Sequence, residues 1–378
     1  MRKLIYIANA RMPTEKAHGI QIAKMCEAFA GTGAEVDLIL PWRVNRMSGD
    51  LFRYYGVKRS FAVRRFFTLD MLWLPFLKPL WFFLQTVSFV KIVWLASRVR
   101  SREWRASIVY TRELLVTAFP PRAKELIFEI HRLPKKNTWI WRRALARVDR
   151  LVVISDGLKE DLLAFGVQPE KIMVALDAVD LAQFDITVSQ KEAREKLDLP
   201  LDRQIVMYTG HLYDWKGAET LLAAASMCPD KRFIFVGGTK EDRKAFEIKA
   251  KGMTHVLVLG HRSPDMIPLY LKAADILVIP NSGKEVVSAR YTSPMKLFEY
   301  MAARRPIIAS DLPSIRETLD DSTATFFAPD NAQSLTNAIQ FVFMHAEESA
   351  QKADRAFEKV KECTWSKRAQ KILHLCAA

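Results

Sequence analysis

The feature that most constrains the fold is an alternation of short apolar runs with longer helical patterns, which occurs twice along the 378 residues. Apolar runs of strand length lie in the first half at 4–8, 35–40, 108–110, 126–130 and 151–154. A second series lies at 204–210, 232–236, 255–258, 276–279 and 307–309. Strands that alternate with helices predict parallel sheets covered by helices, and the length suits two domains of ordinary size. We therefore expect two α/β domains.

A polar stretch at 186–203 separates the two series and contains the short helical pattern "SQKEAREKLDLP". We place the domain boundary there, with a first domain at 1–185 and a second at 186–360. A charged helix is expected over 331–359, and "CTWSKRAQKILHL" predicts a final amphipathic helix within 361–378.

The cysteine pattern argues against a disulfide framework or a zinc site. Four cysteines are present, with no Cys-x-x-Cys pair and no metal-binding Cys/His spacing. The apolar run after the first residues is too short for a signal peptide and reads as a buried strand. We therefore expect a protein of the reducing cytoplasm.

The net charge of +15 is concentrated in one segment, because residues 42–105 hold 13 Lys and Arg against 3 Asp and Glu. The same segment contains "MLWLPFLKPLWFFLQTVSFVKIVWLAS", whose longest charge-free run has 12 residues and falls short of the ~20 that span a bilayer. Its aromatic residues are Trp73, Phe76, Trp81, Phe82, Phe83, Phe89 and Trp94. Aromatic residues between arginines favour a membrane-surface segment over 64–105, with a buried core helix, a nucleic-acid patch and a subunit contact as alternatives.

The stretch "SPMKLFEYMA" predicts a helix with one lysine and one glutamate on an otherwise apolar pattern. Ser293 is a suitable N-cap and Pro294 suits the first helical position. The first turn offers free backbone N–H groups to an anion, and Lys296 would add a charge beside them. Glu299, one turn later, could accept hydrogen bonds from a ribose diol. The alternative is an N-capped helix with two solvated charges.

Loops that follow the expected strands carry further candidates, because ligands of open α/β sheets bind beyond the carboxyl ends of the strands. "YTGHLYDWKG" offers Gly210, His211 and Lys216, and "FVGG" offers a close backbone approach. "VLGHRSPD" offers a pocket for a base edge, and "FEIHRLP" places His131 after a first-half strand. The alternatives are solvated loops and a strand-end histidine with an ordinary structural role.

Taken in order, these pieces resemble the retaining GT-B glycosyltransferases, especially family 4, over nearly the whole chain. The resemblance rests on "HGIQIAKMCEAFAGTGAEVDLILP", "EIH", "VVISDGLKEDLLAFGV", "YTGHLYDWKG", "VGG", "GHRSPDMIPLYLKAADILVIPN" and "SPMKLFEYMAARRPIIASDLPSIRE". It implies two Rossmann-like domains facing across a cleft, with the C-terminal helix crossing back to the first domain.

The resemblance also implies roles for individual residues. Lys216 would bind the donor diphosphate, Glu299 the ribose and His131 the transferred sugar, and these three form the expected catalytic set. The expected donor-binding set is Gly19, Gly210, His211, Gly237, Gly238, His261, Arg262, Tyr291, Ser293, Pro294, Met295, Lys296 and Leu297.

Four positions depart from the family pattern. Tyr291 stands where the first glutamate of a Glu-x7-Glu pair is usual, and His211 stands where an arginine is usual. The first glycine loop reads Ala17-His18-Gly19 rather than carrying two adjacent glycines, and Asp177-Ala178 replaces an Asn-Gly near the hinge. The substitution of Tyr291 for a carboxylate makes the sugar harder to infer.

The implied function is transfer of a sugar from a nucleoside diphosphate sugar to a hydroxyl acceptor with retention of anomeric configuration. The resemblance implies no metal or other cofactor, since lysine and backbone N–H groups would hold the diphosphate. The expected partners are a nucleotide sugar, an anionic membrane surface and a lipid-linked or glycan acceptor, without nucleic acid, on the inner face of the plasma membrane. Two alternatives remain: a sugar-nucleotide epimerase or hydrolase of the same fold, and a nucleic-acid-binding or scaffold protein. The donor base, sugar, acceptor, linkage and oligomeric state do not follow from the sequence.

Overall fold

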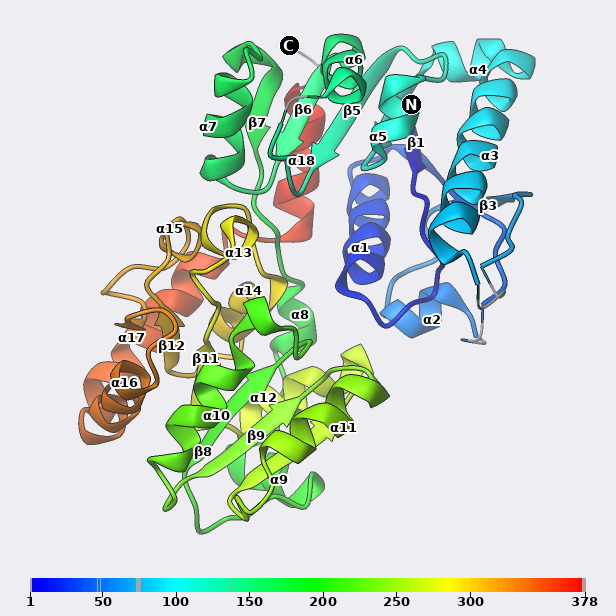
Figure 1. Cartoon of the computed structure of the whole chain (residues 1–378). Coiled ribbons are helices and arrows are strands. Elements are labelled where there is room, and N and C mark those ends of the chain that lie inside the picture. The colour runs from blue at the N-terminus through cyan, green and yellow to red at the C-terminus, as the bar shows by residue number, and fades with distance from the viewer. Residues whose placement is uncertain (1, 46, 48, 73–75, 137, 376–378) are drawn as a thin grey trace. The chain divides into compact units, whose positions relative to one another are not determined.

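The structure is a computed structural model that describes residues 2–45, 47, 49–72, 76–136 and 138–375, so Trp73 and Cys376 lie outside the described residues. Contacts between residues divide the chain into two compact units (Figure 1). Unit 1 comprises Met1–Ile154, Leu158–Ala175 and Trp365–Ala378, and unit 2 comprises Ser155–Gly157 and Leu176–Thr364.

Unit 1 is built on a parallel sheet of seven strands in the order β3-β2-β1-β4-β5-β6-β7. The strands are β1 (Lys3–Ile7), β2 (Glu35–Pro41), β3 (Ala62–Phe66), β4 (Ser107–Thr111), β5 (Glu125–Ile130), β6 (Arg150–Val153) and β7 (Ile172–Val174). Its helices are α1 (Ala17–Gly31), α2 (Leu51–Tyr55), α3 (Lys78–Val99), α4 (Ser101–Arg105), α5 (Leu114–Ala118), α6 (Trp139–Arg147), α7 (Asp156–Ala164, from Leu158 onward), η1 (Pro169–Lys171) and α18 (Trp365–Leu375).

Unit 2 contains a parallel sheet of six strands in the order β10-β9-β8-β11-β12-β13. The strands are β8 (Ile205–Thr209), β9 (Arg232–Val236), β10 (Val256–Gly260), β11 (Ile276–Ile279), β12 (Ile307–Ser310) and β13 (Thr325–Phe327). Its helices are α8 (Leu181–Phe184), α9 (Gln190–Lys196), η2 (Asp214–Lys216), α10 (Ala218–Ser226), α11 (Lys240–Lys249), η3 (Pro264–Met266), α12 (Ile267–Ala273), α13 (Val286–Arg290), α14 (Met295–Ala302), α15 (Pro313–Arg316), α16 (Ala332–Met344) and α17 (Ala346–Val360).

The two expected α/β domains with parallel sheets are therefore confirmed, and each expected strand is present. The sequence missed β3, β7 and β13, which lie at sheet edges. β7 and β13 have three residues each, and β3 carries two arginines in "AVRRF". Edge strands are short and less buried, so their apolar signal is weak. The helix expected over 331–359 is two helices, because it breaks at His345.

The contact-based division changes from unit 1 to unit 2 after Ala175, whereas the polar stretch had suggested a boundary near Asp185. Residues 176–185 belong to unit 2 because they pack there: Leu176, Leu181 and Phe184 contact its core. α18 belongs to unit 1, where it packs along α1.

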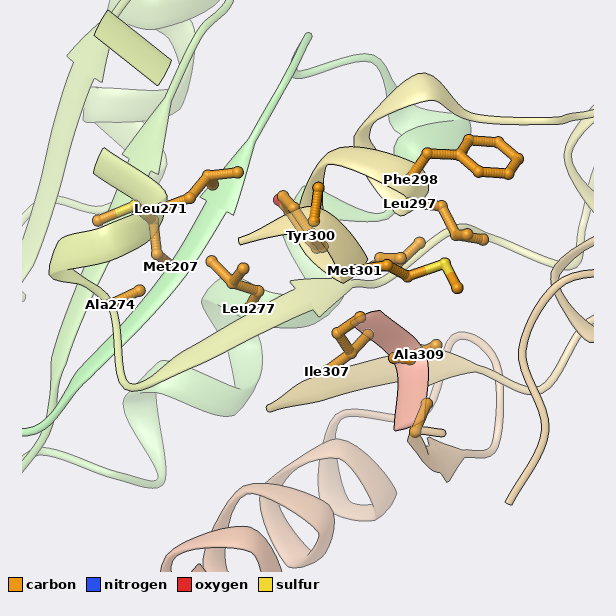
Figure 2. Close-up of a cluster of buried hydrophobic side chains, with 14 of the residues drawn as sticks. Met207, Leu271, Ala274, Leu277, Leu297, Phe298, Tyr300, Met301, Ile307 and Ala309 are labelled. Carbon is orange, nitrogen blue, oxygen red and sulfur yellow. The ribbon is translucent and has the colours of Figure 1, made fainter. Parts of the chain in front are cut away.

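A hydrophobic cluster of unit 2 is built around the apolar face of α14 (Figure 2). Leu297, Phe298 and Met301 are fully buried and pack with Leu277 of β11 and Ile307 of β12. Burying a large apolar side chain contributes about 1.5–3 kcal/mol. The apolar face thus fixes α14 against the sheet and orients the polar residues at its start.

Helix α3 is apolar around its circumference but packs into unit 1 along one side. Its buried residues are Gln85, Phe89, Val90, Val93 and Ser97. The exposed side chains include Leu80, Phe82, Phe83, Val87, Trp94, Leu95 and Val99. The buried side is anchored by polar contacts, because Gln85 Nε2 donates to Asn9 Oδ1 at 3.0 Å and Asn9 Nδ2 donates to Thr86 Oγ1 at 3.0 Å.

The 12-residue charge-free run predicts that the segment is too short to span a membrane, and this prediction of length is wrong. α3 has 22 residues, or about 33 Å of helix, with a mean hydropathy of 1.5 in its most apolar 18-residue window. Lys78 and Lys91 lie within the helix, and a lysine stem can extend its charge toward water. By length and composition alone α3 is able to cross a membrane. Only 22% of the window is buried, so α3 is not a buried core helix.

The packing around α14 predicts that Phe298→Ala lowers the free energy of unfolding by about 3–5 kcal/mol, the usual cost of deleting a buried phenyl group. Calorimetry should then show the melting transition of unit 2 lowered by about 6–20 °C. Ile248→Ala is the control, because Ile248 of α11 is 74% exposed. Equal shifts in the two variants would contradict the assigned core.

Candidate functional site

The candidate site in unit 2 begins with glycines that let adjacent loops approach closely beyond β8, β9 and β10. Gly210 N donates to Val236 O, and Gly237 N donates to Gly260 O, both at 2.8 Å. Gly237 has φ +129°, and a Cβ there would lie 2.2 Å from Gly210 O. A side chain at Gly237 is therefore excluded by both conformation and space.

Lys296 lies over this glycine corner from the first turn of α14. Its Nζ is 3.8 Å from the Tyr208 ring centroid and would lie 3.4 Å from a Cβ at Gly210. The residue is 8% exposed, and Nζ has no hydrogen-bond partner among the described residues. Burial, then the Lys216 charge, holds the pKa of Lys296 well below its usual value, although Glu299 opposes this. A buried cation without a partner is costly, so this position favours an incoming anion.

Lys216 ends the short helix η2 immediately before α10. Its Nζ lies 3.9 Å from the Trp215 ring centroid. Burial lowers the pKa of Lys216 to about 8, and the Asp177 carboxylate partly opposes the shift. The following Gly217 has φ +70°, and a Cβ there would lie 1.6 Å from Pro280 O. The turn that presents Lys216 therefore requires glycine next to it.

Glu299 lies on α14 one turn after Lys296. Burial raises the pKa of Glu299 to about 7, with the Lys296 charge opposing the shift. The neighbouring Tyr300 holds this part of α14 on the sheet, because Thr209 N donates to Tyr300 Oη at 2.7 Å. Glu299 is thus a half-buried carboxyl group on a fixed backbone.

The start of α14 differs from the expected cap. The helix begins at Met295, Pro294 occupies the N-cap position, and no side chain in the described part of the chain caps the first turn. Ser293 Oγ instead accepts a hydrogen bond from Asp177 N at 2.8 Å. The expected Ser293 cap is therefore wrong, and the first-turn N–H groups lack a capping side chain beside Lys296.

Other expected donor residues have additional structural contacts. Arg262 Nε donates to Tyr270 Oη at 3.0 Å, and its Nη1 donates to Leu259 O at 2.8 Å. The rings of His211 and Tyr213 stack with centroids 4.9 Å apart, and His261 is exposed. Tyr291 is buried, with 7% of its surface exposed.

The structure adds Asn281, which the sequence argument did not select. Asn281 follows β11, is fully buried, and neither amide atom has a hydrogen-bond partner among the described residues. Its backbone N would lie 3.4 Å from a Cβ at Gly217. A buried unpaired amide favours a polar ligand, but nothing in a lone "PN" dipeptide signals its burial.

In unit 1, His131 follows β5 and joins a buried polar network. Its Nε2 lies 2.6 Å from Oε1 of Glu129, whose carboxylate is fully buried. Arg368 Nη2 donates to the same carboxylate at 3.1 Å, and Gln21 Nε2 donates at 2.9 Å. Burial raises the pKa of Glu129, but Arg368 and His131 outweigh it, so the net pKa lies well below its usual value. Glu129 is therefore an ionised support for His131.

Gly19 has a packing reason as well as an expected functional one. A Cβ at Gly19 would lie 2.2 Å from Tyr55 Oη, which accepts a hydrogen bond from Thr14 N at 2.8 Å. The adjacent His18 is kept neutral at physiological pH, because burial and the Arg112 charge lower its pKa to about 4.

Chemically, the unit 2 site combines two lysines, uncapped backbone N–H groups and one carboxyl group of raised pKa. The cations and N–H groups suit a diphosphate, and the carboxyl group suits a diol. Among the described residues, no group of three or more His, Cys, Asp and Glu side chains is placed to hold a metal ion.

Two family models match the chain. Residues 19–183 match the model described as Glycosyltransferase Family 4, and residues 203–344 match Glycosyl transferases group 1. The chain is 24% identical over 200 residues to alpha-D-kanosaminyltransferase of Streptomyces kanamyceticus, covering 50% of each chain. It therefore spans about half the length of the curated relatives it matches.

Solved structures resemble the whole chain. Sucrose-phosphate synthase from Thermosynechococcus elongatus has a TM-score of 0.78 at 18% identity, covering 100% of this chain and 98% of its own. Anabaena Alr3699/HepE, solved in complex with UDP and glucose, has a TM-score of 0.75 at 16% identity, covering 100% of both chains. At these identities the likeness shows the fold.

The raised pKa of Glu299 predicts a pH dependence of stability. Its pKa is about 7 when folded and 4.5 for the ordinary carboxyl group. The folded state therefore holds more protons between these pH values, and the free energy of unfolding falls as pH rises through them. Glu299→Gln removes this loss of stability. The melting temperature of the variant minus that of wild type should therefore become larger between pH 5 and pH 8.

Glu241→Gln provides the control, because Glu241 is an exposed residue of α11 in the same unit. A pH-independent difference between Glu299→Gln and wild type would show that the carboxyl group is not held in the buried environment described.

Proposed function

We propose that this chain, which belongs to the GT-B glycosyltransferases of the family 4 type, transfers a sugar from a nucleoside diphosphate sugar to a hydroxyl acceptor. The observation that carries the proposal is Lys296, a buried lysine whose Nζ has no hydrogen-bond partner among the described residues and which lies above Gly210 at a helix start that no described side chain caps. A diphosphate supplies the missing negative charge, and Lys216 contributes a second cation. Glu299 would bind the ribose.

The proposed reaction retains the anomeric configuration. The bond between the anomeric carbon and the diphosphate oxygen breaks, and a bond to the acceptor oxygen forms on the same face. The acceptor proton passes to an oxygen of the leaving diphosphate. Lys216, Lys296 and the first-turn N–H groups of α14 stabilise the charge that develops on that diphosphate, without a metal ion in this proposal.

His131 is assigned the contact with the transferred sugar. Its support is the carboxylate of Glu129, held ionised by Arg368, which fixes the orientation of the ring. The resemblance to HepE, solved with UDP and glucose, supports a nucleotide sugar as the donor class and makes UDP the first nucleotide to test.

We also propose that unit 1 binds an anionic membrane surface through α3, on the cytoplasmic face of the plasma membrane. Phe82, Phe83 and Leu95 are at least half exposed, which is unusual for large apolar side chains on one helix. Arg100, Arg102 and Arg105 are exposed immediately after this helix and complement anionic headgroups.

A membrane-surface position suits α3 better than a span because polar groups on its inner side bond to the folded unit. Gln85 and Thr86 bond to Asn9, and Ser88 Oγ accepts from Leu69 N at 3.1 Å. Spanning would break these contacts and leave their polar groups in hydrocarbon. A lipid-linked acceptor would then meet the enzyme at the surface.

The donor site predicts that Lys216→Ala and Glu299→Ala each weaken nucleoside diphosphate binding by about 1.5–3 kcal/mol, or about 10- to 150-fold. Calorimetry with UDP and GDP measures this directly. Binding to wild type at pH 8.5 should also take up protons, because a bound diphosphate favours the charged form of Lys216. The uptake appears as a buffer-dependent enthalpy and should be smaller in Lys216→Ala, where Lys296 is the remaining lysine of lowered pKa at the site.

His131→Ala is the matched comparison, since it should lower turnover while leaving nucleoside diphosphate affinity unchanged. The donor-site assignment fails if Lys216→Ala and Glu299→Ala both bind UDP and GDP as wild type does. Loss of nucleotide binding in His131→Ala with transfer intact would overturn the role given to His131.

The membrane proposal predicts that wild type sediments with phosphatidylglycerol-containing vesicles at low salt and is partly released at high salt. Each exposed arginine contributes about 1 kcal/mol near an anionic surface. Two variants should remain largely in the supernatant while still binding nucleotide. One replaces Arg100, Arg102 and Arg105 by serine, and the other replaces Phe82 and Phe83 by serine.

Ile248→Ser controls for the loss of an exposed apolar residue elsewhere and should sediment as wild type does. If the wild-type protein ignores anionic vesicles at every salt concentration, the membrane proposal is wrong and a soluble acceptor is the better hypothesis.

A further inference from the structure

A pocket of about 120 Å³ opens in unit 1, and three of its lining residues are arginines: Arg11, Arg43 and Arg65. Much of the remaining wall is apolar or backbone, including Pro13 and Pro41. No carboxylate lines the pocket among the described residues. Three arginines therefore line one small pocket.

The strand topology explains why these arginines meet. Arg11 follows β1, Arg43 follows β2, and Arg65 lies near the end of β3, opposite Leu40 in the register. The three strands are adjacent and parallel, so their carboxyl ends lie at one edge of the sheet. Ligands of open α/β sheets bind at that edge.

Neighbouring arginines on β3 have different partners. Arg64 Nη2 lies 2.9 Å from Asp37 Oδ2 and is neutralised there. Arg65 forms no salt bridge within the described part of the chain, and its Nη2 makes only a long contact of 3.4 Å with Met12 O. Successive strand residues point to opposite faces, so the pairing of Arg64 leaves the charge of Arg65 available.

The other two arginines are also incompletely compensated. Arg11 lies 3.8 Å from Glu15, a distant pair with the Arg11 side chain 34% exposed. Arg43 has no salt bridge among the described residues, and its Nε is buried without a hydrogen-bond partner. Burial lowers the pKa of Arg43, and Arg11 adds to the effect while Asp70 opposes it.

The pocket wall is braced by its own hydrogen bonds. Asn45 Nδ2 donates to Pro13 O at 2.9 Å, and Val44 N donates to Asp70 Oδ2 at 2.8 Å. Asp70 is therefore engaged by the backbone of the loop that carries Arg43. The arginines lie on a wall built before any ligand arrives, which lowers the cost of binding.

We propose that this three-arginine pocket binds a phosphate group and that the acceptor substrate carries it. Guanidinium groups match phosphate oxygens with paired N–H donors, and three of them suit a phosphate monoester or diphosphate. The volume of about 120 Å³ suits a group of this size. The acceptor assignment rests on the proposed glycosyltransferase function, and the phosphate site itself does not.

The test measures pyrophosphate binding by calorimetry in the full-length Lys216→Ala, Lys296→Ala protein, in which both lysines of the proposed phosphate site of unit 2 are removed. Adding Arg43→Gln and Arg65→Gln should weaken this binding by at least about tenfold. Lys58→Gln with Arg59→Gln is the matched control, because it removes two exposed positive charges from the same unit and should change affinity less than about threefold.

The double variant Arg43→Lys, Arg65→Lys tests the geometry, because it keeps both charges and should retain part of the pyrophosphate affinity. If the glutamine pair lowers the melting temperature, the lysine pair should restore it. Pyrophosphate binding that is unchanged in the folded glutamine variant overturns the site. Nucleotide binding is measured separately in wild type. If wild type binds UDP but the pyrophosphate test fails, only the phosphate-pocket proposal is refuted and the proposed donor site stands.

Two further arms identify the source of the phosphate. A lipid phosphate is supported if wild type prefers phosphatidylcholine vesicles with phosphatidic acid over vesicles with oleic acid, and the glutamine variant loses that preference. A soluble sugar phosphate is supported if the variant loses affinity for glucose 1-phosphate while its vesicle binding is unchanged. If neither preference depends on Arg43 and Arg65, the acceptor assignment is wrong.

Discussion

The unit 2 site depends on the burial of Lys296, whose nitrogen atom forms no ion pair or hydrogen bond with any residue that the structure describes. α14 can hold the lysine there because Leu297, Phe298 and Met301 pack into the core on the same helix. The apolar contacts hold Lys296 in a buried position that is unfavourable for its charged form. The lowered pKa of Lys296 has the same cause. A folded state that carries such a cost locally is prepared for an anion before one arrives.

Much of the fold could be predicted because its central strands are nearly continuous apolar runs between helical patterns. β3, β7 and β13 escaped prediction because edge strands need less apolar sequence. The break at His345 was missed because the amphipathic pattern continues on both sides of it. α3 was judged by its charge-free run, whereas its helical length is set by backbone geometry that tolerates Lys78 and Lys91.

The candidate site was predictable where one short motif carries several groups. Lys296 and Glu299 lie one turn apart on α14, so their proximity follows from helical spacing. Asn281 could not be selected, because its burial depends on the loop against Gly217. The arginine pocket was also invisible, since it requires the register of three strands. For Ser293 the sequence predicted a role that the structure does not show. Its side chain accepts a hydrogen bond from Asp177 N instead of capping α14.

The placement of α18 has a consequence for the order in which the chain matures. Unit 1 is discontinuous, and Arg368 reaches Glu129 from a segment that follows all of unit 2 in the sequence. On the ribosome, unit 2 emerges complete while the carboxylate beneath His131 still lacks its arginine. Domains generally fold as units during synthesis, so the second unit finishes first and the first unit closes last. The histidine site of unit 1 can therefore be completed only after unit 2 has been synthesised.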